Sequence, residues 1–445
     1  MRKAGISSLW YGAEGAGLYF ILGVILLASI ALYSLFVQAC CSSAANPVSY
    51  PHGSHLDTNL FDGGYNHTYY SNSTFGDLNV TLNSTLVPFM TVYGNLLLTG
   101  TGPSIGNVQH FGGSVVALNI ESGNVVWKTP LQNFVMSEPL VVGNEVIVEM
   151  GKSQPSYPNG VIALNISNGS IIWQENTTQT AMIMPIYTDN AIYASGGGFA
   201  YAMDPENGTV IKSLFSDPEI SMAQPMLING TIYQNMFYNG NYSVVGINTS
   251  NWTAIWKVNI ADAHGLIDTP PSFYLGNVII GYYNQSADRG EGDVIIEGVN
   301  SSGGGIRWKS ILYNNTPKTA DGYAYSRSYM QYGPVLSPIT VHNGIGYIDS
   351  NLNGILYAFN ATSGKIIWAF RTDGDNTNPN IIGNVLFIVN EGGELFAINA
   401  TSGNLISAKY IGMPSVANGV IIARNSIVVG GINGTIRTFT LNSIV

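Results

Sequence analysis

Charged and aromatic side chains gather in two stretches of a chain in which only 9% of residues are charged. One is Tyr313–Tyr332, YNNTPKTADGYAYSRSYMQY, and the other, SADRGEGD, is Ser286–Asp293. Arginine and tyrosine combine apolar area with a polar tip, so they are frequent at binding hot spots, and arginine suits an anion or a carbohydrate. We therefore predict binding by six side chains: Asp321, Tyr325, Arg327, Tyr329, Asp288 and Arg289. The alternatives are loops that only pack against the fold or lie under glycans, and catalysis.

A possible metal-binding group lies further towards the N-terminus, in Ser42–Phe75. This segment is rich in Pro, Gly, Asn and Ser and has no sustained hydrophobic period, which is typical of a linker. Its potential ligands are His52, His55, His67, Asp57 and Asp62. Because no predicted helix or strand fixes the imidazole rings, we predict no metal site.

A repeated hairpin motif organises the rest of the chain. Gly354–Thr372, GILYAFNATSGKIIWAFRT, reads as an alternating strand, a tight Asn/Ser/Gly turn and a second strand that carries Trp368. Weaker copies place Lys212 or Ser407 at the tryptophan position, and one has Trp252 in place of the turn glycine. The tryptophan-equivalent positions are 127, 173, 212, 256, 308, 368 and 407. This spacing is close to the roughly 40 to 50 residues of a four-stranded propeller blade.

The repeat, A-L/F/I-N-x-x-S/T-G-x-x-x-W, resembles the pyrroloquinoline-quinone (PQQ) type β-propeller repeat from about Leu86 to the C-terminus. The resemblance implies an all-β propeller but not its function, because quinone-dependent dehydrogenases share the repeat with propellers that hold no quinone. Quinone dehydrogenases need a Ca²⁺ site, a catalytic Asp and commonly an Arg, and the candidates here would be Glu297, Asp321 and Arg327. No motif matches that family's cofactor residues, and no Cys-x-x-Cys-His haem motif occurs. We therefore predict neither PQQ nor Ca²⁺.

The repeat interval predicts eight blades. A further interval of about 39 residues after position 407 runs just past the C-terminus, so the last unit, Pro414–Val445, lacks its final strand. Its other strands are expected at Gly419–Ala423, Ser426–Gly431 and Thr435–Leu441. The alternating run Asp77–Leu86 lies about 45 residues before Trp127, and we expect it to supply the missing strand. Closure by both ends of the chain leaves no open sheet edge. Seven blades with an irregular cap is the alternative.

In the frame of the tryptophan-equivalent positions, Ser286–Asp293 lies one blade before Tyr313–Tyr332.

The overall charge argues against nucleic acid as a partner. The net charge is −10, the pI is about 4.9, and no basic stripe is present to neutralise phosphates. Low charge density also suits an acidic environment, because a protein with few paired carboxylates loses little stability when they are protonated. We expect no sharp fall in melting temperature between about pH 6 and pH 3.

The N-terminal region predicts a single-pass membrane anchor. Residues 17–39 form an apolar run long enough to cross a hydrocarbon core of about 30 Å, and no Lys or Arg occurs between Lys3 and Lys128. We predict a cytoplasmic segment 1–16, a transmembrane helix 17–39, an extracellular linker 40–75 and an extracellular propeller 76–445. The alternatives are a cleaved signal peptide, a lipoprotein-like site before Cys40, and a pilin-like cut after Lys3. Cys40 and Cys41 are adjacent and form no disulfide framework.

Asn-x-Ser/Thr sequons are dense and agree with an outside location. The predicted glycosylation sites are Asn66, Asn72, Asn79, Asn83, Asn165, Asn176, Asn207, Asn229, Asn241, Asn248, Asn284, Asn300, Asn314, Asn360, Asn399 and Asn433. The combination resembles archaeal cell-surface proteins.

Together these features predict a membrane-anchored extracellular propeller that binds or scaffolds envelope proteins or glycans and catalyses no reaction. The alternative is an extracellular enzyme of the PQQ-propeller type, similar to tetrathionate hydrolases or, less closely, to quinone-dependent dehydrogenases. No signature in the sequence selects either activity.

Overall fold

The computed structural model describes most of the region from residue 68 onward. The described residues are 68–69, 78–82, 86–102, 112–133, 135, 137–150, 160–176, 185–188, 191–196, 199–214, 225–238, 241–260, 270–285, 292–313, 339–350, 354–372, 378–390, 392–412, 421–423, 425–431 and 433–444. The predicted cytoplasmic segment 1–16, the apolar segment 17–39 and residues 40–67 of the predicted linker lie outside this set. Among the described residues, no helix has the length and apolar character needed to cross a bilayer. Of the two compact units, Met1–Cys40 and Cys41–Val445, all described elements belong to the second.

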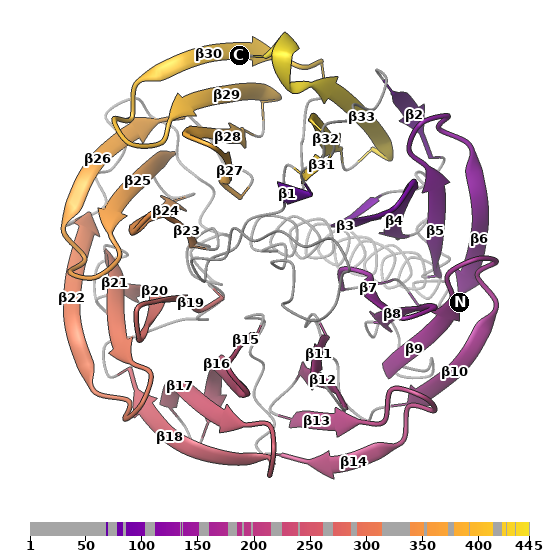
Figure 1. Ribbon diagram of the computed structural model, residues 1–445, viewed down its shortest axis with the longest axis horizontal. Coiled ribbons are helices and arrows are strands. Elements are labelled where there is room, and N and C mark those ends of the chain that lie inside the picture. Colours follow the sequence, from indigo (N-terminus) through magenta and orange to yellow (C-terminus); the bar gives the residue numbers. More distant parts are fainter. Residues whose placement is uncertain are drawn as a thin grey trace, which may run out of the picture. The chain divides into compact units, whose positions relative to one another are not determined.

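The described chain forms eight β-sheet blades around a central axis, which confirms the predicted all-β, eight-bladed propeller (Figure 1). Blade 8 combines both ends of the propeller region. The strands of each blade follow, from the innermost outward.

Blade 1 consists of β3 (Leu86–Tyr93), β4 (Leu96–Thr101), β5 (Gly113–Asn119) and β6 (Val125–Leu131), and blade 2 of β7 (Leu140–Val142), β8 (Glu145–Met150), β9 (Gly160–Asn165) and β10 (Ile171–Asn176). Blade 3 consists of β11 (Ile186–Thr188), β12 (Ala191–Gly196), β13 (Phe199–Met203) and β14 (Val210–Ser213), and blade 4 of β15 (Met226–Ile228), β16 (Thr231–Tyr238), β17 (Asn241–Asn248) and β18 (Thr253–Asn259). Blade 5 consists of β19 (Ser272–Tyr274), β20 (Asn277–Gln285), β21 (Gly292–Asn300) and β22 (Ile306–Tyr313), and blade 6 of β23 (Thr340–His342), β24 (Ile345–Ser350), β25 (Ile355–Asn360) and β26 (Ile366–Arg371). Blade 7 consists of β27 (Asn380–Ile382), β28 (Val385–Val389), β29 (Glu394–Asn399) and β30 (Leu405–Tyr410), and blade 8 of β1 (Thr68–Tyr69), β31 (Ile421–Ala423), β32 (Ser426–Gly430), β33 (Thr435–Thr440) and β2 (Asn79–Thr81).

The hydrophobic core lies between neighbouring blades. The second and third strands are buried on both faces, as in β9, whereas the outermost strand β10 alternates in its burial and is mostly exposed. Side chains of adjacent blades form shared apolar clusters; one between blades 1 and 2 includes Val115, Trp127 and Ile162. Period-two alternation therefore presents apolar side chains to the neighbour on either side of each blade.

Blade 8 closes the ring as the sequence predicts. β2, which lies within the predicted run Asp77–Leu86, pairs antiparallel with β33, with Asn79 opposite Arg437. The backbone N–H of Leu78 donates to Thr438 Oγ1 at 2.7 Å. A further strand comes from the segment expected to be a linker, because β1 pairs in parallel with β31 and is the innermost strand of the blade. A short 3-10 helix, Leu441–Ser443, follows β33.

A tryptophan of one blade packs against the hairpin turn of the next blade and donates a hydrogen bond to it. Trp127 Nε1 donates to the carbonyl of Ile166 at 2.8 Å, and its ring packs where a Cβ on Gly169 would lie, 2.5 Å from Cε3. Trp173, Trp256 and Trp368 repeat the bond to the carbonyls of Pro205, Ser301 and Ala400. The glycine has a positive φ in each of these turns, so the close contact and the backbone conformation both require it.

Two residues at the boundary between blades 3 and 4 depart from the repeat. Lys212 takes the tryptophan position and donates to the carbonyl of Asn251 at 3.0 Å. The turn glycine is replaced by Trp252, which has φ +56 and stacks on Tyr193 with ring centroids 6.1 Å apart. At this boundary, lysine replaces the tryptophan of the outer strand and a bulky side chain replaces the turn glycine.

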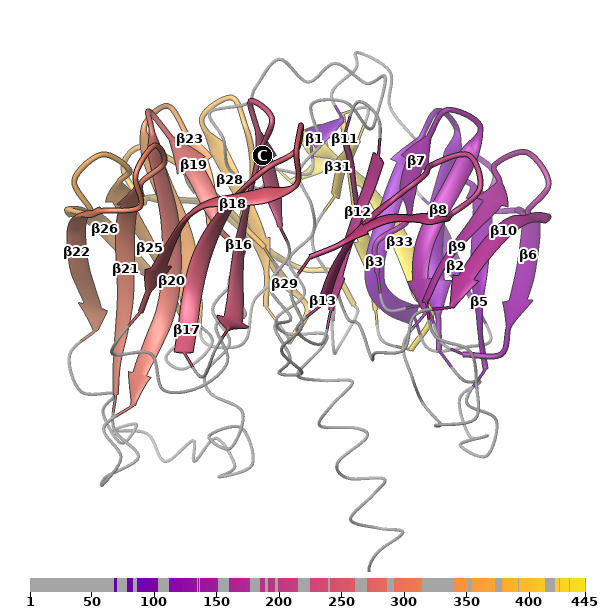
Figure 2. The same ribbon diagram turned by 90° about the horizontal axis from the view of Figure 1, so that it is seen from below.

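The two ends of the blades differ in their connections. In an antiparallel four-stranded blade, the first–second and third–fourth connections lie at one end and the second–third connection at the other. We call the first end the turn face; it carries tight turns such as Gly94–Asn95 and the hairpin 120–124, and it is uppermost in Figure 2. We call the opposite end the loop face. The segment that connects each outermost strand to the next blade begins at this face.

Candidate functional site

The two stretches predicted to bind begin at the same end of one blade. In blade 5, Gln285 pairs with Gly292, so residues 286–291 connect β20 to β21 at the loop face. Tyr313, the last residue of β22, pairs with Val294 and lies at that same end. The prediction that the stretches lie one blade apart is therefore wrong, because the first connects two strands within blade 5 and the second follows that blade's last strand. The six predicted binding residues themselves lie outside the described residues: Asp288, Arg289, Asp321, Tyr325, Arg327 and Tyr329.

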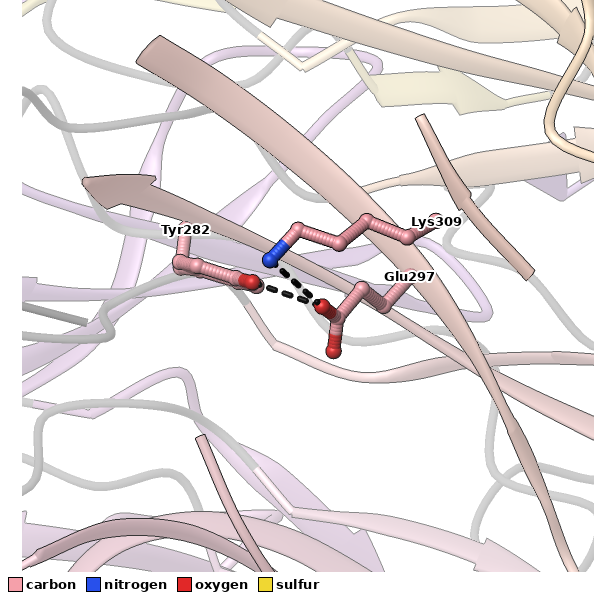
Figure 3. A network of polar contacts seen from close by, with 3 residues as sticks. All are labelled: Tyr282, Glu297 and Lys309. Carbon is pink, nitrogen blue, oxygen red and sulfur yellow. Dashed lines mark hydrogen bonds and ion pairs between the residues drawn. The ribbon is translucent and has the colours of Figure 1, made fainter. Parts of the chain in front are cut away.

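Three polar side chains meet within the same blade. Tyr282 of β20 donates its hydroxyl to Glu297 Oε1 of β21 at 2.7 Å. Lys309 of β22, which is opposite Glu297 in the register, places Nζ 3.2 Å from the same oxygen. Figure 3 shows the hydroxyl and the ammonium converging on this carboxylate. The lysine Nζ also lies 5.6 Å from the centroid of the Tyr282 ring. We call these three residues the blade 5 triad.

The electrostatics of the blade 5 triad favour a fixed hydrogen-bonding cluster over a proton-transfer site. Glu297 is 2% exposed and Lys309 36% exposed, so a buried carboxylate is neutralised by a partly solvated ammonium. Burial raises the pKa of Tyr282 well above its ordinary value, and the phenol stays a donor near neutral pH. Glu297 Oε2 is buried and has no hydrogen-bond partner within the described chain, which leaves one acceptor for a water molecule or a ligand donor.

A second buried carboxyl lies near the axis, between the innermost strands of blades 1 and 2. Thr91 Oγ1 donates to Glu138 Oε1 at 2.9 Å and to the carbonyl of Pro139 at 2.6 Å. Burial raises the pKa of Glu138 well above its ordinary value, although the bond from Thr91 opposes this. Sequence reasoning missed this residue. The available signal was a carboxyl immediately before the proline that opens an inner strand, in a chain with few charges.

Of the three residues considered for a Ca²⁺ and quinone site, the structure describes Glu297. Within the described residues, no group of three or more His, Cys, Asp and Glu side chains is placed to hold a metal ion. The Oε1 atom of Glu297 is bound by the Lys309 ammonium. Asp321, Arg327 and the histidines 52, 55 and 67 lie outside the described residues.

The predicted glycosylation sites divide between described and undescribed residues. Asn66, Asn72, Asn83 and Asn314 lie outside the described residues. The others lie in strands or turns of the propeller: Asn79, Asn165, Asn176, Asn207, Asn229, Asn241, Asn248, Asn284, Asn300, Asn360, Asn399 and Asn433.

Fold, repeat and blade number define the class of protein as a PQQ-like repeat β-propeller. The chain belongs to the family whose model is described as outer membrane protein assembly factor BamB, which matches residues 90–277 and 291–432. No curated protein matches the chain significantly.

Several solved structures are similar in fold. BamB from Moraxella catarrhalis has 13% sequence identity and a TM-score of 0.60, with 83% of this chain and 98% of that chain covered. The computationally designed Ika8 protein has 13% identity, a TM-score of 0.58 and coverage of 81% and 97%. Quinohemoprotein alcohol dehydrogenase from Comamonas testosteroni has 12% identity, a TM-score of 0.56 and coverage of 88% and 78%. At these identities the likeness concerns the fold alone, which an assembly factor, a designed protein and an enzyme all share.

Proposed function

We propose that this protein is a membrane-anchored, extracellular propeller that binds and scaffolds components of the cell envelope without catalysis. The apolar run 17–39 supplies the anchor, and the absence of Lys and Arg between Lys3 and Lys128 supports an outside location. The family description, an assembly factor for outer membrane proteins, supports protein partners.

The observation that carries the binding proposal is that both inserted stretches start at the loop-face end of blade 5. The two stretches start close together, because Gln285 pairs with Gly292 and Tyr313 pairs with Val294 in the same sheet. The blade 5 triad links β20, β21 and β22 within that sheet. Loops raised on a rigid scaffold are common binding elements. Arg327 and Asp321 are the proposed contacts within the longer stretch.

Proximity labelling of the full-length chain on intact native cells tests this proposal. One variant replaces residues 316–330 with a short Gly/Ser linker, and a control replaces the loop-face connection 103–111 of blade 1 in the same way. We expect a reproducible set of envelope neighbours that the first variant loses and the control retains, with similar melting temperatures for both. Retention of every neighbour by the first variant would place the binding surface elsewhere.

Two activity assays on the purified full-length chain separate binding from the enzymatic alternative. Thiosulfate release from tetrathionate at low pH without added cofactor would indicate a hydrolase. Quinone absorbance with Ca²⁺-dependent oxidation would indicate a dehydrogenase. We expect neither signal, and turnover in either assay would overturn the non-catalytic assignment.

A further inference from the structure

Most sequons among the described residues lie on the turn face. The hairpins between third and fourth strands contain Asn165, Asn168, Asn207, Asn248, Asn251, Asn300, Asn360 and Asn399, and a first–second turn contains Asn229. Fewer described sequons lie at loop-face ends of strands, and these are Asn176, Asn241, Asn284 and Asn433. The two faces therefore differ in their potential for N-linked modification.

The turn-face hairpins hold the asparagine amide in one orientation. Asn165 Oδ1 accepts the backbone N–H of Ser167 at 2.9 Å, and Asn360 Oδ1 accepts those of Thr362 and Ser363 at 3.0 Å each. Because the oxygen is fixed by the backbone, the Nδ2 atom of the same amide points away from the turn. In both residues Nδ2 makes no hydrogen bond within the described structure. Nδ2 is the atom to which an N-linked glycan attaches.

The hairpin itself explains the asparagine but not the hydroxyl two residues later. In blade 1, Asn119 Oδ1 accepts the N–H of Glu121 at 3.0 Å, so the same turn forms with no Ser or Thr at that position. In blade 3, Asp204 forms the equivalent bond to the N–H of Glu206 at 2.8 Å. Conversely, the exposed hydroxyl of Thr362 makes no hydrogen bond within the described residues. The turn therefore leaves the Thr362 hydroxyl unexplained, whereas Ser250 Oγ donates to Asn248 Oδ1 at 2.6 Å and Thr401 Oγ1 donates to Asn384 Oδ1 at 2.7 Å.

We propose that the turn face is the glycosylated face of the propeller. The modified residues are the asparagines that open the third–fourth hairpins of five blades, Asn165, Asn248, Asn300, Asn360 and Asn399. Their glycans form an arc around one face, at the opposite end of the blades from the loop face. This proposal rests on the outside location in the proposed function.

Glycopeptide mass spectrometry of the full-length chain from its native cells tests the assignment, with two variants in identical turns. Glu121→Thr completes a sequon at Asn119, and we expect one new glycan there. Thr362→Ala keeps the N–H that binds Asn360 but removes the hydroxyl, and we expect loss of the Asn360 glycan with an unchanged melting temperature. Ser363→Ala is the matched control for loss of a hydroxyl in the same turn. It removes the bond of 3.0 Å from Ser363 Oγ to Asn360 Oδ1, but the N–H groups of Thr362 and Ser363 still hold the amide, so we expect the glycan to remain.

Protease digestion of intact cells is run in parallel and separates the two ways in which the proposal can fail. If the propeller is cleaved from outside but the five asparagines carry no glycan, the glycosylated face is refuted and the outside location stands. Greater occupancy at Asn176 and Asn433 than at the five hairpin sites would also refute the choice of face. If the propeller is protected from the protease, the outside location fails and this proposal fails with it.

Discussion

Replacement of Gly208 by alanine tests the contact between the tryptophan of one blade and the turn glycine of the next. Gly208 lies in the hairpin between β13 and β14 with φ +74, and an added Cβ would lie 2.3 Å from Cε3 of Trp173. Left-handed backbone costs alanine about 1–2 kcal/mol, and overpacking a filled site typically costs about 1–3 kcal/mol more. We expect Gly208→Ala to lower the free energy of unfolding by about 2–5 kcal/mol.

Gly143→Ala is the matched control for the backbone cost. Gly143 has φ +57 in the first turn of blade 2, and an added Cβ meets nothing within 4 Å. Only the conformational cost of about 1–2 kcal/mol remains. The difference between the two variants therefore isolates the clash with Trp173.

Urea unfolding of the full-length protein, followed by tryptophan fluorescence and circular dichroism, measures both variants. Coincident transitions and equal m-values are required before midpoints are converted to free energies, because blades can unfold separately. In a Trp173→Leu background, Gly208→Ala should cost no more than Gly143→Ala. Equal losses for the two glycine variants in the wild-type background would refute the proposed role of the tryptophan contact.

Three further changes probe the buried carboxyls and a strained turn. Burial raises the pKa of Glu138 in the folded state above its unfolded value, so the stabilising contribution of this residue is full below the unfolded pKa of about 4.3 and is lost as pH rises through the folded pKa. Glu138→Gln should therefore raise the melting temperature near pH 7 and change it little near pH 3. A change in melting temperature of the same size at both pH values would contradict this. Lys309→Met leaves the Glu297 carboxylate buried without its counter-charge and should lower the free energy of unfolding in urea by about 2–3 kcal/mol. Adding Glu297→Gln in a double variant should restore most of this loss. If the double variant regains no stability, the loss arises from packing. Leu275 is 69% exposed with φ +44, so Leu275→Gly should stabilise the protein by about 0.5–1 kcal/mol through relief of backbone strain, and a thermal melt showing destabilisation would indicate that the leucine side chain makes a stabilising contact.

The spacing of the tryptophan positions was sufficient to predict the hairpins, the eight blades and the closing strand β2. These features follow from a local pattern repeated in one frame, and Trp368 in β26 and Lys212 in β14 both lie where that frame places them. β1 escaped prediction because two residues, Thr68 and Tyr69, carry no period and their pairing with β31 joins distant parts of the chain.

The candidate site was less predictable because it depends on strand register. Glu297 meets Lys309 and Tyr282 only because three strands align at particular offsets, and sequence spacing alone does not fix those offsets. Lys212 and Trp252 were both visible in the sequence as departures from the repeat. Their contacts across the boundary between blades 3 and 4, Lys212 with the Asn251 carbonyl and Trp252 with the Tyr193 ring, required the order of the blades around the axis.

Closure of blade 8 by β1 and β2 joins strands that are far apart in the chain. During synthesis these two strands emerge before the other seven blades, whereas β31, β32 and β33, with which they share a sheet, emerge after them. The ring therefore cannot close until all eight blades have been made, and the high sequence separation predicts that closure is a late, slow folding event. A pull applied to the chain before Thr68 would reach the described propeller first through β1, and so would act on the strands that close the ring.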